Sequence, residues 1–180
     1  NEESHWPIIH AAEEGREGPT IHQVGELSKA TARAIGSFGG APGTGKSYCI
    51  GALALAITRA FGAGQLTVCC PTGKAAVRCT QAMREYGLDL RAKTIHSLLR
   101  VQSADSDDGG DGGWSFEHNE YNPLPYKFII VDEVSMQDVP LMGSLLAARA
   151  KGTNVLFVGD INQLPPVGHG APLRDFIAAG

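Results

Sequence analysis

The sequence predicts an α/β fold in which a mostly parallel sheet is covered by helices on both faces. Short, continuously apolar segments alternate with segments whose apolar residues recur at helical spacing. Strands that are apolar throughout are typical of parallel sheets, because helices bury both of their faces. Several of these segments run directly into glycine-rich or acidic residues, and in such folds ligands bind at the carboxyl ends of the strands.

The first elements lie in the N-terminal third of the chain. Residues 20–35 predict a helix that leads into a short strand over Ile35–Phe38, although Gly36 weakens that strand. Lys46–Ala60 is rich in Ala, Leu and Ile and predicts a second helix, which ends near Gly62.

The middle of the chain predicts a strand followed by two helices. Leu66–Cys70 is a short apolar strand that Pro71 stops. An amphipathic helix follows and ends at Gly87. Its apolar face consists of Ala75, Cys79, Ala82, Met83 and Tyr86. Residues 94–101 predict another short helix.

The last third holds two more apolar strands. Phe128–Val131 and Asn154–Val158 are expected to be buried strands, and Leu141–Ala150 is expected to be the helix between them, ended by Gly152. Residues 103–113 consist of Ser, Ala, Asp and Gly and predict a flexible surface loop.

Length, composition and charge limit the classes of function. The 180 residues, 43% of them hydrophobic, suffice for one domain with a real core. A net charge of −4 argues against a dedicated basic nucleic-acid module, although a motor with a local strand-binding groove remains compatible with it. No apolar run reaches the length of a membrane span, so no membrane partner is expected. The chain begins at Asn1 rather than Met, so an excised fragment is one expectation.

The four cysteines lack the C-x-x-C spacing of a zinc site. They are Cys49, Cys69, Cys70 and Cys79. We expect reduced core thiols in a cytoplasmic protein. The six histidines are scattered, so a metal site built from protein ligands alone is not expected.

The most informative segment fits G-x-x-x-x-G-K-[ST], a phosphate-binding loop. Its glycines let backbone N–H groups turn towards phosphate oxygens, and the following helix points its positive dipole end at the anion. Lys46 is expected to reach the β- and γ-phosphates and Ser47 to bind Mg²⁺. The loop consists of Gly40, Ala41, Pro42, Gly43, Thr44, Gly45, Lys46 and Ser47.

Asp132 and Glu133 close the Phe128–Val131 strand. A hydrophobic strand that ends in Asp-Glu suits a Mg²⁺-nucleotide site, where Asp132 would hold the metal and Glu133 would orient and deprotonate the attacking water. The alternative is a pair of solvated carboxylates at a strand end.

Other strand ends carry polar residues with two open interpretations. Gln163 is a neutral donor that could touch the γ-phosphate or the attacking water, or it could belong to a proline-rich turn. The segments that begin at Thr72 and Thr94 could grip a phosphate backbone, or they could be ordinary capped helix starts.

As an ordered set, these motifs resemble the first RecA-like domain of superfamily 1 DNA helicases, in the RecD-like branch. The set reads GAPGTGKS, CPTGKAA, TIHSLL, FIIVDEVSM and GDINQLPPVGHG, and the resemblance extends over roughly Ile21–Gly180. It implies a RecA-like P-loop ATPase domain over residues 20–180, after an extension over 1–19 without an assigned role.

The resemblance also implies roles for single residues. Lys46 and Ser47 would bind ATP and Mg²⁺, and Asp132 would hold the metal. Glu133 would be the catalytic base, and Gln163 would couple the γ-phosphate to the grip on DNA. The positions that would line the path of single-stranded DNA are Thr72, Gly73, Lys74 and His96. Upstream of the loop stands Gln23, where the family carries a glutamine that reads adenine.

The resemblance implies partners as well. A second RecA-like domain, absent from this chain, would supply arginines to the γ-phosphate, so the isolated chain is expected to hydrolyse ATP poorly. The family moves 5′-to-3′ on single-stranded DNA, works in DNA repair and recombination, and can associate with nuclease or helicase subunits. A Pif1-like helicase, a P-loop kinase or signalling NTPase, and a non-catalytic nucleotide-binding module remain the alternatives.

Overall fold

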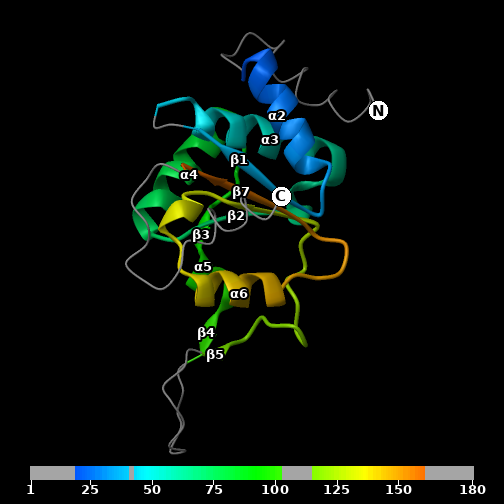
Figure 1. Cartoon of the computed structure of the whole chain (residues 1–180), viewed down its shortest axis with the longest axis vertical. Helices are drawn as coiled ribbons and strands as arrows, with labels where there is room; N and C mark the ends of the chain where they lie inside the picture. The colour runs from blue at the N-terminus through cyan, green and yellow to red at the C-terminus, as the bar shows by residue number, and fades with distance from the viewer. Residues whose placement is uncertain (1–18, 41–42, 103–114, 161–180) are drawn as a thin grey trace, which may run out of the picture.

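A five-stranded parallel sheet forms the centre of the molecule (Figure 1). The structure is a computed structural model that describes residues 19–40, 43–102 and 115–160. The strand order is β1-β7-β6-β2-β3, and every pair in this sheet is parallel. The strands are β1 (Ile35–Gly39), β2 (Leu66–Cys70), β3 (Lys93–Thr94), β6 (Phe128–Val131) and β7 (Asn154–Gly159). The expected parallel sheet is therefore confirmed.

Helices cover both faces of this sheet. One face carries α2 (Ile21–Thr31), α3 (Lys46–Phe61) and α4 (Gly73–Glu85), and the other carries α5 (Ile95–Leu99) and α6 (Val139–Ala147) (Figure 1). Two short 3₁₀ helices, η2 (Ala63–Gln65) and η3 (Val134–Met136), lie in connections. Within the described ranges, no helix combines the length and apolar character that crossing a bilayer requires.

Alternation along the strands divides the buried residues into two cores. Ile130 of β6 packs with residues of α2, α3 and α4, whereas its neighbours Ile129 and Val131 pack on the side of α5 and α6. Successive side chains of a strand point to opposite faces, so an uninterrupted apolar strand supplies both cores at once. This arrangement explains why β6 is apolar at every position.

A small antiparallel ribbon stands apart from the main sheet. It pairs β4 (Val101–Gln102) with β5 (Ser115–Phe116). An ion pair of 2.8 Å between Arg100 and Glu117 lies beside it. The segment 103–113, expected to be a surface loop, lies outside the described residues.

Two helices have bounds that differ from the expected ones, and α6 ends at Ala147 rather than Ala150. α6 begins at Val139 rather than Leu141, because the Asp138 side chain caps it by accepting a hydrogen bond of 3.0 Å from the Leu141 N–H. The proline in its first turn is compatible with a helix start. The short helix expected over 94–101 occupies only Ile95–Leu99, since Thr94 lies in β3 and acts as its cap.

Gly36 of β1 lies against the backbone of Ala30 in α2. A Cβ atom at this position would stand 1.9 Å from the carbonyl oxygen of Ala30, near the end of α2. The glycine that weakened the prediction of β1 is therefore required for its packing, as expected where two backbone segments nearly touch. The strand extends to Gly39, where the phosphate-binding loop follows.

Candidate nucleotide site

Apart from Gln23, which lies at the start of α2, the expected site residues that the structure describes follow the carboxyl ends of parallel strands. The phosphate-binding loop follows β1, Thr72 follows β2, His96 follows β3, and Asp132 follows β6. Because the strands are parallel, these ends lie along a single edge of the sheet. The fold therefore assembles one candidate site from segments distant in sequence.

The phosphate-binding loop has the backbone conformation that its glycines allow. Gly43 and Gly45 adopt φ values of 78° and 80°, which residues with a side chain rarely adopt. α3 begins at Lys46, whose ammonium nitrogen donates a hydrogen bond of 2.6 Å to the Gly40 carbonyl. Ser47 is half-buried in the first turn of α3. Ala41 and Pro42 lie outside the described residues.

Gln23 connects the start of α2 to the phosphate-binding loop. Its side-chain oxygen accepts a hydrogen bond of 2.8 Å from the Thr20 N–H, which completes a capping box. Its amide nitrogen donates a hydrogen bond of 2.7 Å to the Thr44 carbonyl. The side chain thus positions the loop, a contact that the sequence did not indicate, and its role in reading adenine stays a prediction.

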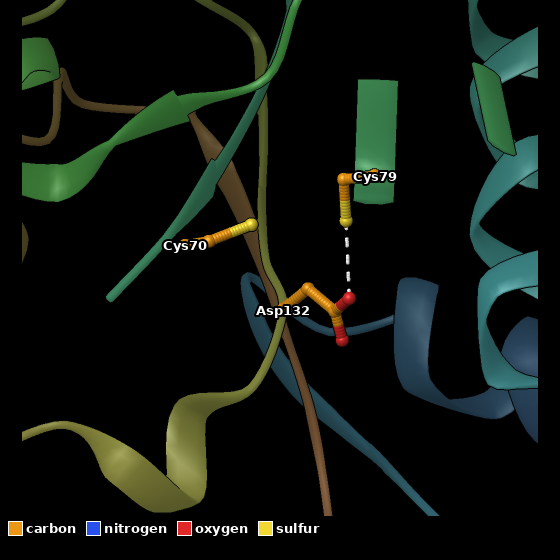
Figure 2. Close-up of side chains that lie close together, drawn as sticks. All are labelled: Cys70, Cys79 and Asp132. Atoms are coloured by element: carbon orange, nitrogen blue, oxygen red, sulfur yellow. Dashed lines mark hydrogen bonds between the residues drawn. The ribbon is translucent and has the colours of Figure 1, made fainter. Parts of the chain in front are cut away.

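Asp132 is a buried carboxylate that neighbouring groups hold in place. Its backbone N–H donates a hydrogen bond of 2.9 Å to the Cys69 carbonyl, which extends the pairing of β6 with β2. One carboxylate oxygen, Oδ1, accepts 2.9 Å from the Glu133 N–H. The other oxygen, Oδ2, lies 3.0 Å from the Cys79 sulfur, which donates to it (Figure 2).

Two thiols accompany this carboxylate. The ligand atoms of Cys70, Cys79 and Asp132 all lie within 4.8 Å of one another, and all three residues are buried (Figure 2). Hydrogen bonding to Cys70, burial and the charge of Asp132 raise the pKa of Cys79 above its usual range. Burial also raises the pKa of Cys69, and that of Cys49 to about 11.

The four cysteines are free and buried, as expected for core thiols. Two of them belong to a group of possible metal ligands, which the sequence did not indicate. Cys79 and Asp132 are separated by 53 positions in the sequence. The available signal was indirect: Cys70 and Val131 end neighbouring strands, and Cys79 lies on the apolar face of the next helix.

Glu133 adopts a left-handed backbone conformation, with φ 55° and ψ 35°. Such a conformation costs a residue with a side chain about 1–2 kcal/mol, and residues of this kind cluster at functional sites. The carboxylate lies 3.7 Å from the guanidinium of Arg78, which is largely exposed, so this ion pair contributes little stability.

The expected DNA-contacting residues fall into two groups. Thr72, Gly73 and Lys74 are exposed at the start of α4, and the Thr72 hydroxyl caps this helix by accepting a hydrogen bond of 3.3 Å from the Ala75 N–H. His96 is half-buried, with its ring centroid 6.2 Å from that of Phe116. Gln163 lies outside the described residues.

Comparison with known protein families gives a match over most of the chain. The family described as an AAA domain matches residues 23–169. The chain belongs to this family. The match includes the phosphate-binding loop, Asp132 and Glu133, and thus the whole described part of the candidate nucleotide site.

Several curated relatives of this AAA domain have names of the RecD type. The ATP-dependent RecD2 DNA helicase of Deinococcus radiodurans is 40% identical over 158 residues, which cover 88% of this chain and 20% of the relative. The RecBCD enzyme subunit RecD of Mycobacterium tuberculosis is 36% identical over 154 residues, covering 77% and 25%. The chain thus spans a fifth to a quarter of these relatives, and the RecD-like resemblance is confirmed.

Solved structures of Pif1 helicases share the fold of this AAA domain. Pif1 from Bacteroides sp in complex with ADP-AlF4 matches with a TM-score of 0.54 and 20% identity, over 89% of this chain and 36% of that chain. A structure of two coordinating Pif1 helicases at forked double-stranded DNA gives 0.56 and 19%, over 89% and 38%. The expected RecA-like fold is confirmed.

Proposed function

We propose that this AAA domain is the first motor domain of an ATP-dependent DNA helicase of the RecD-like branch. It would couple ATP hydrolysis to movement on single-stranded DNA in the 5′-to-3′ direction. The observation that carries the proposal is the joint placement of the phosphate-binding loop and the Asp132–Glu133 pair at one edge of a parallel sheet. The 40% identity to a RecD2 DNA helicase supports the choice of branch.

The phosphate-binding loop would hold the triphosphate of ATP. Backbone N–H groups at the start of α3 carry partial positive charge, which favours an anion there. The Lys46 ammonium, already folded over the loop on the Gly40 carbonyl, would exchange this contact for the β- and γ-phosphates. Gln23 would keep the loop in position through Thr44.

The residues at the end of β6 suit a Mg²⁺ ion and a hydrolytic water. Asp132 offers a buried carboxylate oxygen whose partner is a thiol, a weak donor that a cation can displace. Asp132 and the Ser47 hydroxyl would hold the ion, which neutralises charge on the phosphates when bound. Glu133 would orient the attacking water and accept its proton.

The remaining parts of the motor are proposed from the RecD-like resemblance. A second RecA-like domain would supply arginines to the γ-phosphate. Gln163 would couple the presence of the γ-phosphate to the binding of DNA. Single-stranded DNA would pass over four residues at the ends of β2 and β3: Thr72, Gly73, Lys74 and His96. The RecD relative is a subunit of the RecBCD enzyme, which supports a role beside nuclease or helicase subunits.

A Pif1-like helicase is the second candidate, and the fold similarity to Pif1 structures favours it. The identities of 19–20% to those structures are well below the 36–40% to RecD-type relatives, so we prefer the RecD-like assignment. Both candidates share the ATP-driven mechanism at the same edge of the sheet.

ATP turnover by this chain, measured with and without unstructured single-stranded DNA, tests the proposal. Lys46→Ala serves as the control, together with binding of a fluorescent ATP analogue. We expect binding that depends on Lys46 and little turnover until a second RecA-like domain is supplied. Strand-stimulated turnover by this chain alone would contradict the need for that domain. The absence of both binding and turnover would contradict the ATPase assignment.

A further inference from the structure

The carboxylate of Asp132 and the thiols of Cys70 and Cys79 form a buried group with the donor atoms of a metal site (Figure 2). We call these three residues the thiol–carboxylate cluster. Cys70 is 0% exposed, Cys79 2% and Asp132 7%. Cys69 does not belong to the cluster, since it packs into the core on the opposite face of the sheet. The cluster therefore contains two of the four cysteine thiols.

Three different elements fix the cluster in place. Cys70 is the last residue of β2, and Asp132 follows β6, the neighbouring strand. Cys79 reaches the same point from α4. The Glu133 N–H occupies Oδ1 of Asp132, which leaves Oδ2 turned towards the Cys79 sulfur at 3.0 Å. The donor atoms are thus held together before any ligand arrives.

The spacing of these atoms suits a small tetrahedral cation. Bonds of about 2.3 Å to sulfur and about 2.1 Å to oxygen place tetrahedral ligands roughly 3.5–3.8 Å apart. The cluster's donor atoms lie within 4.8 Å of one another, and the Cys79–Asp132 pair lies at 3.0 Å. Small side-chain adjustments therefore suffice to bring all three atoms to bonding distance of one cation.

We propose that Cys70, Cys79 and Asp132 bind a soft divalent cation such as Zn²⁺ or Cd²⁺. Thiolate ligands select such ions, whereas Mg²⁺ prefers oxygen ligands. On binding, both thiols release their protons to solvent, and bonds to the cation replace the hydrogen bond between Cys79 and Asp132. Two thiolates and one carboxylate then carry three negative charges around an ion with two positive charges.

The proposed site has a consequence for the nucleotide site, which rests on the proposed function. Asp132 would serve both cations, so Zn²⁺ in the cluster would prevent Asp132 from holding Mg²⁺. We expect Zn²⁺ to weaken Mg²⁺-dependent binding of a fluorescent ATP analogue. Removing Cys79 should relieve this inhibition while leaving Lys46, Ser47 and Asp132 in place.

A direct test is titration of the reduced protein with Cd²⁺, followed by the ultraviolet charge-transfer absorption of thiolate–cadmium bonds. Zn²⁺ affinity is then measured by competition with a chromophoric chelator. We expect one cation per chain, not displaced by excess Mg²⁺. Cys70→Ala and Cys79→Ala should each reduce the affinity by more than the roughly 10–100-fold that loss of an outer-shell partner causes. Cys49→Ala, which removes a buried thiol outside the cluster, should bind normally.

Circular dichroism establishes that each variant is folded. If one of Cys70→Ala and Cys79→Ala does not fold, the other is compared with wild type and Cys49→Ala. Equal Cd²⁺ binding by wild type, Cys70→Ala and Cys79→Ala would overturn the proposal, as would an equal loss in Cys49→Ala. The titration does not require nucleotide. A protein that binds Cd²⁺ through the cluster but no ATP analogue would support the metal site and contradict the proposed function. The opposite pattern would contradict the metal site alone.

Discussion

The side-chain amide nitrogen of Gln23 donates a hydrogen bond of 2.7 Å to the backbone carbonyl of Thr44, inside the phosphate-binding loop. The same side chain caps α2 through Thr20. Gln23 lies 21 positions upstream of Thr44 and contacts the loop from α2. Its amide nitrogen bonds to the loop, whereas its amide oxygen takes part in the capping box. Gln23 thus connects the N-terminal cap of α2 to the phosphate-binding loop.

Gln23→Ala is expected to weaken binding of a fluorescent ATP analogue by about 5–10-fold, since a net hydrogen bond contributes about 1 kcal/mol. Equilibrium fluorescence titration measures the change. Thr20→Ala is the control, because it removes the hydroxyl cap at a cost of about 0.5–2 kcal/mol in stability but leaves the contact with Thr44. A loss of affinity shared by ATP and GTP analogues would fit the positioning role. A loss confined to adenine nucleotides would assign Gln23 to base recognition instead.

Gly36→Ala should destabilise the domain severely. The new Cβ atom would lie 1.9 Å from the Ala30 carbonyl oxygen, so α2 and β1 must separate. We expect a loss of about 3 kcal/mol in the free energy of unfolding, at the upper end for overpacking. Urea denaturation followed by circular dichroism provides the measurement. Gly143→Ala, on an exposed position of α6 with open space around it, should instead gain up to about 1 kcal/mol. Similar effects at both positions would contradict the close approach.

Lys74→Ala should weaken binding of single-stranded DNA without changing stability, since the side chain is exposed at the start of α4. If Lys74 contacts a phosphate, the slope of log affinity against log salt should fall by about 1. Fluorescence anisotropy at several salt concentrations measures both quantities. Arg84→Ala removes an exposed charge from the last turn of the same helix and should have a much smaller effect. Equal effects of the two substitutions would indicate a general contribution of charge rather than a contact at Lys74.

Glu133→Gln should retain ATP binding and lose turnover in a protein that also contains the second motor domain. Removal of a general base typically lowers the rate by about 10²–10⁴-fold. A coupled ATPase assay and analogue binding separate the two effects. Arg78→Ala is the matched control, because its guanidinium lies 3.7 Å from the same carboxylate but is solvent-exposed. Turnover that survives in Glu133→Gln would show that another group activates the water.

Four strands of the main sheet, β1, β2, β6 and β7, could be predicted from the sequence because each contributes to both cores. Ile129 and Ile130 face opposite sides, so β6 is apolar at every position and stands out from its surroundings. β3 has only Lys93 and Thr94, which is too short for any periodicity, and it was not predicted. The early start of α6 depends on the Asp138 cap, a local contact that a search for apolar spacing overlooks.

The candidate site also has a part that could be predicted from the sequence and a part that could not. The phosphate-binding loop is one continuous segment, and Asp132 and Glu133 are adjacent to each other. The residue types in each segment alone therefore indicated phosphate and metal chemistry. The contacts of Gln23 with Thr44 and of Cys79 with Asp132 join segments that are 21 and 53 positions apart. Such contacts depend on how helices sit on the sheet, and a single sequence carries no direct record of that.

The left-handed backbone of Glu133 also affects how this domain should be engineered. Selection for heat resistance alone would favour Asn at this position, because Asn adopts that conformation more readily. The resulting protein would survive heating better and would lack the carboxylate proposed to activate water. Thermostability screens of this domain should therefore hold position 133 fixed, or pair each round with an assay of ATP turnover.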